Sequence, residues 1–167
     1  MTDSIPHQPA SHRAAKSGAQ SSRLPEFREL TPAQSTMILA RHNVGRIAYT
    51  FHDRVGIEPI HYVYENGLLY GRTSHGSKLK VLAHHRWVAF EVDEVEGLFD
   101  WRSVAVQGTF DLAHHDGSPA ARAVWQHAVE LLSALVPGTM SASDPAAFRT
   151  VVFRIHVNAI TGRQASS

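Results

Sequence analysis

The chain has 167 residues, of which 43% are hydrophobic and 19% charged, and a formal net charge of +1. This length allows one domain with a substantial hydrophobic core, and a nearly balanced charge without a long Lys/Arg cluster argues against general nucleic-acid binding. No apolar run approaches the roughly 20 residues of a membrane-spanning helix, no secretory signal is recognisable at the N-terminus, and the lack of Cys excludes disulfides and thiolate chemistry. We therefore expect a cytoplasmic protein that binds neither nucleic acid nor membrane.

Residues 1–25 are rich in Ser, Gln, Ala, Pro and His and contain almost no large apolar side chains. Such a segment buries too little apolar surface to offset the entropy of ordering, so we predict a disordered tail at 1–25 and a folded domain at 26–167. The Thr-Pro-Ala-Gln motif that follows fits a capping box, with Thr31 as N-cap and Gln34 at the third helical position. This motif predicts a helix from Thr31 to about Arg41.

Alternating apolar residues predict six strands in the rest of the chain. Pro59 in the second of them indicates a sheet edge or a bulge, because proline cannot donate to a ladder. Asn66-Gly67 predicts a tight hairpin, since a type I′ turn needs a positive φ at both central residues. The six predicted strands are residues 44–51, 57–64, 68–73, 87–93, 101–112 and 150–157.

The segments between these strands predict two more helices, a short one at 77–85 and a longer one at 118–136. We expect a turn at 52–56 and an acidic loop at 94–100, and Asp144-Pro145 can start one further helical turn. Because most strands are neighbours in sequence, the expected fold is mainly β, an antiparallel barrel with peripheral helices. The buried stripe of the longer helix is predicted to be Val124, Ala128, Leu131 and Leu135.

A basic, hydroxyl-rich loop from Thr73 to Lys78 precedes the short helix. Free backbone N–H groups and the helix dipole favour an anion at such a position. Lys78 adds a mobile positive charge, Arg72 adds a bidentate donor, and the hydroxyls of Thr73, Ser74 and Ser77 add neutral hydrogen bonds. We interpret the loop as a phosphate site; the competing interpretation is a solvated helix start.

Two pairs of adjacent histidines, His84-His85 and His114-His115, raise the question of a metal site. Adjacent side chains on a helix or strand point apart, so one pair does not readily chelate one ion. The sequence also lacks an HExxH motif and a Cys-bearing zinc pattern. No metal site is predicted.

Seven short motifs occur in order between about residues 28 and 164. They are VGRIA (44–48), PIHYVY (59–64), LY (69–70), TSHGSKL (73–79), VAFEV (88–92), WRSV (101–104) and ITGR (160–163). In their order and spacing they resemble the pyridoxamine 5′-phosphate oxidase-like, FMN-binding split-barrel superfamily. Within it, the chain is most similar to the branch of nitroimidazole-resistance (Nim-type) proteins.

This resemblance implies a six-stranded antiparallel split barrel that forms a homodimer, with FMN bound at the dimer interface. Three groups of residues are implied to contact the cofactor. Those beside the flavin ring, through backbone groups, are Ile60, His61 and Tyr62. Those of the phosphate loop are Arg72, Thr73, Ser77, Lys78 and Leu79. Those that approach the flavin from the partner chain are Trp101, Arg102 and Ser103, although Trp101 can equally be plain interface packing.

The resemblance further implies an FMN-dependent oxidoreductase that reduces a small, nitro-compound-like molecule, with NAD(P)H or a partner as electron donor. His75 is the candidate catalytic residue, because an imidazole with a reference pKa of about 6.5 can donate a proton to a reduced substrate. Tyr62 stands where the true oxidases carry a basic residue, so pyridoxamine phosphate oxidation is not expected. Two alternatives remain open: deazaflavin (F420) in place of FMN, and a non-catalytic protein that binds a flavin or another small ligand.

Overall fold

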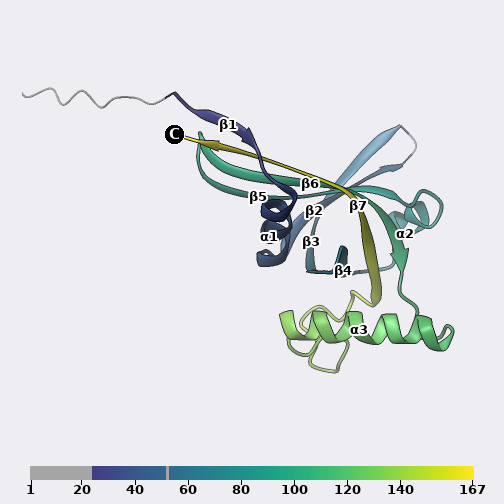
Figure 1. Cartoon of the computed structure of the whole chain (residues 1–167). Helices are drawn as coiled ribbons and strands as arrows, with labels where there is room; N and C mark the ends of the chain where they lie inside the picture. Colours follow the sequence, from purple (N-terminus) through teal and green to yellow (C-terminus); the bar gives the residue numbers. More distant parts are fainter. Residues whose placement is uncertain (1–23, 52) are drawn as a thin grey trace, which may run out of the picture.

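The computed structural model describes residues 24–51 and 53–167, and this part contains seven strands that form one antiparallel sheet. The strands are β1 (Glu26–Glu29), β2 (Val44–Phe51), β3 (Arg54–Glu65), β4 (Leu68–Thr73), β5 (Trp87–Gly97), β6 (Asp100–Leu112) and β7 (Val151–Ser166). Their order is β1-β7-β4-β3-β2-β5-β6, and an additional pairing of β7 with β6 closes six of them into a ring. The predicted six-stranded antiparallel barrel is therefore confirmed, with β1 paired to the end of β7 outside the ring (Figure 1).

Three helices surround the barrel in the described part of the chain: α1 (Pro32–Arg41), α2 (Ser77–Leu82) and α3 (Pro119–Leu135). α1 packs mainly on β7 and β3, α2 on β2, and α3 on β4, β7 and β3. Figure 1 shows α3 lying across the lower end of the barrel. No helix of the described residues is long and apolar enough to cross a membrane.

Two local predictions are confirmed in atomic detail. Thr31 Oγ1 accepts a hydrogen bond from the Gln34 N–H at 3.3 Å, and Gln34 Oε1 accepts one from the Thr31 N–H at 2.9 Å, which is the capping box that starts α1. Between β3 and β4, Asn66 and Gly67 both have positive φ angles, 50° and 80°. Asn66 and Gly67 therefore form the tight hairpin turn that the sequence predicts, and this turn fixes the register of the two strands.

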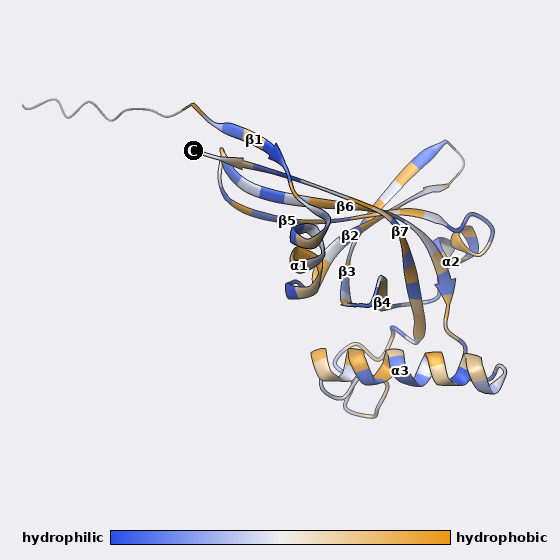
Figure 2. Cartoon of the chain, in the orientation of Figure 1, coloured by the Kyte–Doolittle hydropathy of each residue, from blue (hydrophilic) through white to orange (hydrophobic). Residues whose placement is uncertain are grey.

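The hydrophobic core has two parts that share strand β4. The barrel interior contains Tyr62, Phe90, Phe110 and Phe153 among its buried side chains, and the rings of Phe110 and Phe153 are stacked with centroids 4.9 Å apart. A second cluster, Tyr70, Ala128, Leu132 and Val152, lies where α3 covers β4 and β7. Hydrophobic and hydrophilic residues alternate along the barrel strands (Figure 2). Because β4 is covered on both faces, its polar end at Arg72 and Thr73 is buried as well.

Several strands extend beyond their predicted limits. Residues 54–56, expected in a turn, belong to β3; residues 94–97, expected in an acidic loop, belong to β5; and β7 continues past residue 157 to Ser166. β1 was not predicted at all. Residues 54–56 and 94–97 lie outside the core, and residues 158–166 are mostly small or polar, although Gln164 and Ala165 among them are buried. Backbone ladder bonds to neighbouring strands hold these segments, and hydrophobic alternation does not report such bonds.

The helical predictions need smaller corrections. The short helix expected at 77–85 ends at Leu82, and the extra helical turn at Asp144-Pro145 is absent, because this segment forms turns. On α3, Ala128 is buried as predicted, and Leu132, which was not predicted, is buried as well. The other three residues of the predicted stripe are only half-buried: Val124, Leu131 and Leu135. The predicted tail at 1–25 lies outside the described residues except for residues 24 and 25.

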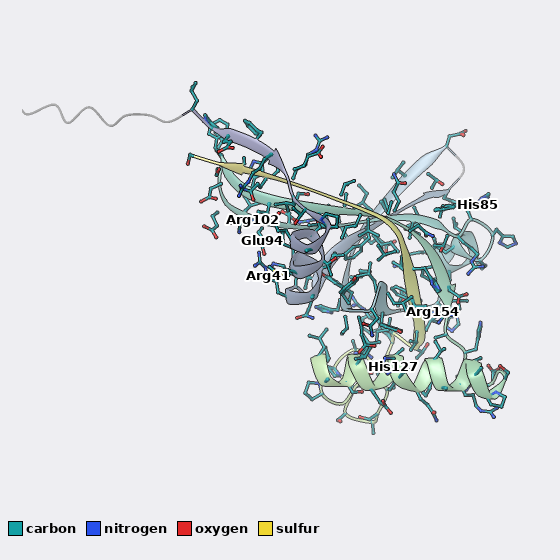
Figure 3. All side chains as sticks on the ribbon, viewed as in Figure 1. Arg41, His85, Glu94, Arg102, His127 and Arg154 are labelled. Carbon is teal, nitrogen blue, oxygen red and sulfur yellow. The ribbon has the colours of Figure 1, made fainter. Side chains whose placement is uncertain are left out.

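Glu94, in the part of β5 that was expected to be a loop, connects the end of α1 to the barrel (Figure 3). Its carboxylate accepts hydrogen bonds from Arg41 Nε at 2.6 Å and from the His42 ring at 2.5 Å, and it pairs with Arg102 at 3.4 Å. Burial by itself raises the pKa of Glu94, but the hydrogen bonds from these partners outweigh it and lower the pKa from 4.5 to about 2. Glu94 is therefore ionised in the folded protein down to strongly acidic pH.

We expect the contribution of Glu94 to stability to be present above about pH 4.5 and to be lost as the pH falls toward 2, because its pKa is lower in the folded than in the unfolded state. Since Arg41 is half-exposed, solvent screening limits this contribution to about 1 kcal/mol. Urea unfolding of Glu94→Gln at several pH values tests this expectation. The variant should be less stable than wild type at pH 6 and equal to it near pH 2, and exposed Glu96→Gln is the control. A difference that does not change with pH would contradict it.

Candidate functional site

A pocket of about 230 Å³ opens where β3 and β4 separate. The β3–β4 ladder runs from Glu65↔Leu68 to Tyr62↔Gly71 and ends there, after which β3 continues on β2 while β4 continues on β7. The space between the diverging strands is closed by the loop before α2 and by the segment that precedes β7. The residues that line the pocket are Glu58, Pro59, Ile60, Arg72, Thr73, Ser74, Gly76, Lys78, Phe148 and Arg149.

One wall of the pocket is a strand edge. The Tyr62 N–H donates to the Asn43 carbonyl at 2.9 Å on the β2 side of β3. Because successive residues of a strand point their backbone groups to opposite sides, the N–H of His61 and the carbonyl of Pro59 face the other side, where β4 has diverged. Pro59 is tolerated here because the N–H that it lacks would not have bonded to β2.

The three strand residues predicted beside a cofactor ring are thus placed differently from one another. Ile60 is buried and lines the pocket, and the His61 side chain is exposed. Tyr62 belongs to the core: its hydroxyl donates to the Leu39 carbonyl at 2.9 Å, and burial raises its pKa well above the usual range. Strand alternation directs the His61 N–H to the side from which β4 has diverged, although His61 is not among the residues that line the pocket.

Arg72 is held by the carboxylate of Asp144, which no sequence motif indicated. Its guanidinium donates to both oxygens of Asp144, with Nη2 2.8 Å from Oδ1, and the two side chains are only 7% and 2% exposed. Asp144 also accepts the N–H groups of Met140 at 2.7 Å and Ala146 at 2.8 Å. These bonds, that from Arg72 above all, keep the pKa of Asp144 well below its usual range. Arg72 therefore anchors the segment between α3 and β7 to the barrel.

Lys78 reaches across the pocket to Glu58. Its ammonium donates to Glu58 Oε2 at 2.5 Å, and the Tyr49 hydroxyl donates to Glu58 Oε1 at 2.7 Å. Burial raises the pKa of Glu58, but the two hydrogen bonds have the larger effect, and the pKa is lowered overall. Burial and the bond to Glu58 together raise the pKa of Tyr49 to about 12. An ammonium has three N–H donors, so Lys78 keeps two for a ligand while Glu58 holds it in place.

The charges and hydroxyls of the pocket suit an anion. Three cations line the pocket: Arg72, Lys78 and Arg149. Two carboxylates partly offset their charge, because Glu58 pairs with Lys78 and Asp144 pairs with Arg72. Arg149 forms no ion pair with any residue that the structure describes. Thr73 and Ser74 add hydroxyls from the wall opposite β3. Lys78 with the hydroxyls of Thr73 and Ser74 therefore suits one phosphate group, and Arg149 is a further cation at the pocket that no sequence motif indicated.

The other residues of the predicted phosphate loop are not part of this wall. His75 is exposed and lies between Ser74 and Gly76, which do line the pocket. Ser77 begins α2, and its side chain lies outside what the structure describes. Leu79 packs into the barrel core.

Residues 101–103, at the start of β6, are not brought to this pocket within one chain. Trp101 lines a different pocket with residues of β1 and β7, and its ring lies 6.3 Å from that of Phe27. Arg102 pairs with Glu94, and the Ser103 hydroxyl donates to Glu91 at 3.1 Å. The resemblance assigned these residues to the partner chain, so only a second copy could bring them to the phosphate pocket. Among residues 24–51 and 53–167, no group of three or more His, Asp or Glu side chains could hold a metal ion.

A comparison of the chain with models of protein families gives one match. A family model described as pyridoxamine 5′-phosphate oxidase matches residues 31–164, which is most of the chain. The chain belongs to the pyridoxamine 5′-phosphate oxidase family. The match confirms the resemblance seen in the seven sequence motifs. Among curated proteins, none matches the chain.

Several solved structures have a similar fold. An FAD-binding protein from Mesorhizobium loti is 27% identical, with a TM-score of 0.68 over 86% of this chain and 99% of that one. The FAD-binding protein from Mycobacterium smegmatis is 25% identical, with a TM-score of 0.59 over 83% and 98%. A candidate 5-nitroimidazole antibiotic resistance protein from Bacteroides thetaiotaomicron is 17% identical, with a TM-score of 0.63 over 87% and 93%. At 17% identity the last likeness shows the fold alone.

Proposed function

We propose that this protein is a flavin-dependent oxidoreductase that binds the phosphate of its cofactor in the pocket between β3 and β4. The observation that carries the proposal is the pairing of a cationic, hydroxyl-lined wall with an open backbone edge of β3. Family membership and two relatives named as FAD-binding proteins support a flavin. FMN, the cofactor expected from the sequence, and FAD share the riboflavin 5′-phosphate group that this pocket would recognise.

Each wall has a separate role in this proposal. Lys78 and the Thr73 hydroxyl bind phosphate, while the His61 N–H and the Pro59 carbonyl offer hydrogen bonds to the polar edge of a ring. Glu58 keeps Lys78 extended over the pocket, and Asp144 keeps Arg72 from moving. A bound flavin supplies hydride and single-electron transfer. The exposed His75, beside the pocket, is the candidate proton donor to a small, nitro-compound-like substrate, with NAD(P)H as the electron donor.

A homodimer is part of the same proposal. On the outer surface of β2, β3 and β5, a groove of about 360 Å³ is lined largely by apolar atoms, and Val55 and Trp87 in it are 67% and 66% exposed. Exposed apolar patches of this kind mark protein–protein contacts. We expect a dimer by light scattering, and we expect Trp87→Glu to give a monomer. If residues 101–103 of a second copy complete the flavin site, the monomer should also lose flavin affinity.

The first experiment is the visible absorbance spectrum of the purified protein, with identification by mass of whatever is released on denaturation. Released FMN or FAD would support the proposal, and released F420 would replace it with the deazaflavin alternative. A colourless protein that takes up neither added FMN nor added FAD would overturn it. Bound flavin without turnover across a panel of electron donors and acceptors would favour a non-catalytic binding protein.

A further inference from the structure

Two pocket residues, Phe148 and Arg149, come from the segment between α3 and β7, which no sequence motif connected with the site. Phe148 is 67% exposed although it stands at the edge of a polar pocket. The Arg149 guanidinium lies 5.6 Å from the centroid of the Phe148 ring. An exposed aromatic ring next to a cation without a carboxylate partner among the described residues is a suitable arrangement for a nucleotide.

The backbone segment that carries these two side chains is held by the buried Arg72–Asp144 ion pair. Asp144 accepts backbone N–H groups at both ends of its turn and is held bidentately by Arg72 of β4. The Arg149 N–H donates to the Ala146 carbonyl at 2.9 Å, so this turn leads directly to Phe148 and Arg149. The segment is therefore organised before any ligand arrives, which lowers the entropy cost of binding.

The pocket also contains one more cation than a single phosphate group needs. Lys78 and the hydroxyl wall already suit one phosphate, and Arg149 adds a planar fork that can bind a second phosphate through two parallel hydrogen bonds. Phe148, immediately before it in the chain, presents an aromatic face at the edge of the pocket. Within one pocket, Lys78, Arg149 and Phe148 thus offer groups suited to a phosphate, a second phosphate and a base.

We propose that Phe148 and Arg149 form a second subsite, which binds the adenosine monophosphate part of FAD, so that the protein prefers FAD to FMN. The inference rests on the proposed function, since it places the first phosphate at Lys78. A nicotinamide dinucleotide carries the same adenosine monophosphate group. FAD is favoured because only in FAD is that group joined covalently to the riboflavin 5′-phosphate that the proposal places at Lys78.

The test measures dissociation constants of FMN and FAD for the full chain freed of ligand. For wild type we expect FAD to bind about 10-fold more tightly than FMN. Phe148→Leu, which keeps an apolar side chain but removes the aromatic face, and Arg149→Ala should each weaken FAD about 10-fold and leave FMN within about twofold. Phe148→Tyr should retain the FAD preference. Arg122→Ala, on the exposed face of α3, is the matched control and should change neither constant.

The outcomes separate this inference from the function on which it rests. If wild type binds neither flavin, the proposed function fails. If it binds both equally, or if the variants weaken FMN and FAD alike, flavin binding stands and the second subsite is overturned. In parallel, NADH is titrated into the FMN-loaded protein. If Arg149→Ala loses NADH binding and wild type shows no preference for FAD, the subsite binds the nicotinamide dinucleotide, and the assignment to FAD is overturned. Light scattering of Phe148→Leu checks that the exposed ring is not a dimer contact, and a monomeric variant would overturn the stacking role.

Discussion

Replacement of Lys78 by alanine is expected to weaken flavin binding by roughly 100-fold, because it removes the charge-assisted hydrogen bonds to the phosphate. The loss should exceed that of a simple surface lysine, since the substitution also leaves the Glu58 carboxylate without its ammonium partner at the edge of the pocket. That negative charge would then repel a phosphate directly. Fluorescence titration of FMN and FAD against the ligand-free protein measures the effect.

Glu58→Gln provides the opposite test. It removes a negative charge from the pocket and also the contact that holds Lys78 in place. We expect the loss of the charge to outweigh the loss of this contact, so flavin should bind more tightly than in wild type. In the double variant, the glutamine should recover part of the affinity that Lys78→Ala loses. Lys80→Ala on the same helix is the control, because Lys80 is exposed and does not line the pocket. Equal losses for Lys78→Ala and Lys80→Ala would show that only the general charge of α2 matters and would place the phosphate elsewhere.

Phe153→Ala is expected to lower the free energy of unfolding by about 3–5 kcal/mol, because it leaves a large cavity in the barrel core. Phe153 is 2% exposed and stacks on Phe110. Typical domains are stable by only about 5–15 kcal/mol, so this loss is a large part of the total. Urea unfolding followed by far-UV circular dichroism, without flavin, measures it. A loss below about 1 kcal/mol would mean that the barrel interior repacks around the missing ring.

The same ring explains why β4 carries a glycine just before it diverges from β3. A Cβ at Gly71 would lie 2.5 Å from the Phe153 ring, so Gly71→Ala should be destabilising in the wild-type background. In the Phe153→Ala background the clash is absent, and the same substitution should cost much less. Gly97→Ala, whose Cβ would meet only Asp100 at 3.8 Å, is the control and should be nearly neutral. Additive effects of Gly71→Ala and Phe153→Ala would disprove the contact.

The sequence alone determined the features that depend on local chemistry. The capping box at Thr31 and the positive φ angles at Asn66-Gly67 need only near neighbours in the chain, and both are present as predicted. Alternation of apolar residues located six barrel strands, and the order of seven motifs indicated the family that the whole-chain match confirms. The loop between a strand and a helix keeps Arg72, Thr73 and Lys78 close, and all three line the pocket between β3 and β4.

Only the tertiary structure decided which charges meet. Arg72 and Asp144 are 72 residues apart, and nothing in either segment indicates that the closure of β7 onto β4 joins them in a buried pair. The same closure brings Arg149 to the pocket. Likewise, the outer parts of β5 and β7 show little apolar alternation in the sequence, and backbone bonds to neighbouring strands hold them in the sheet. Hydrogen bonds between distant backbones and pairs of distant charges leave no local pattern, since each depends on where the fold places the other partner.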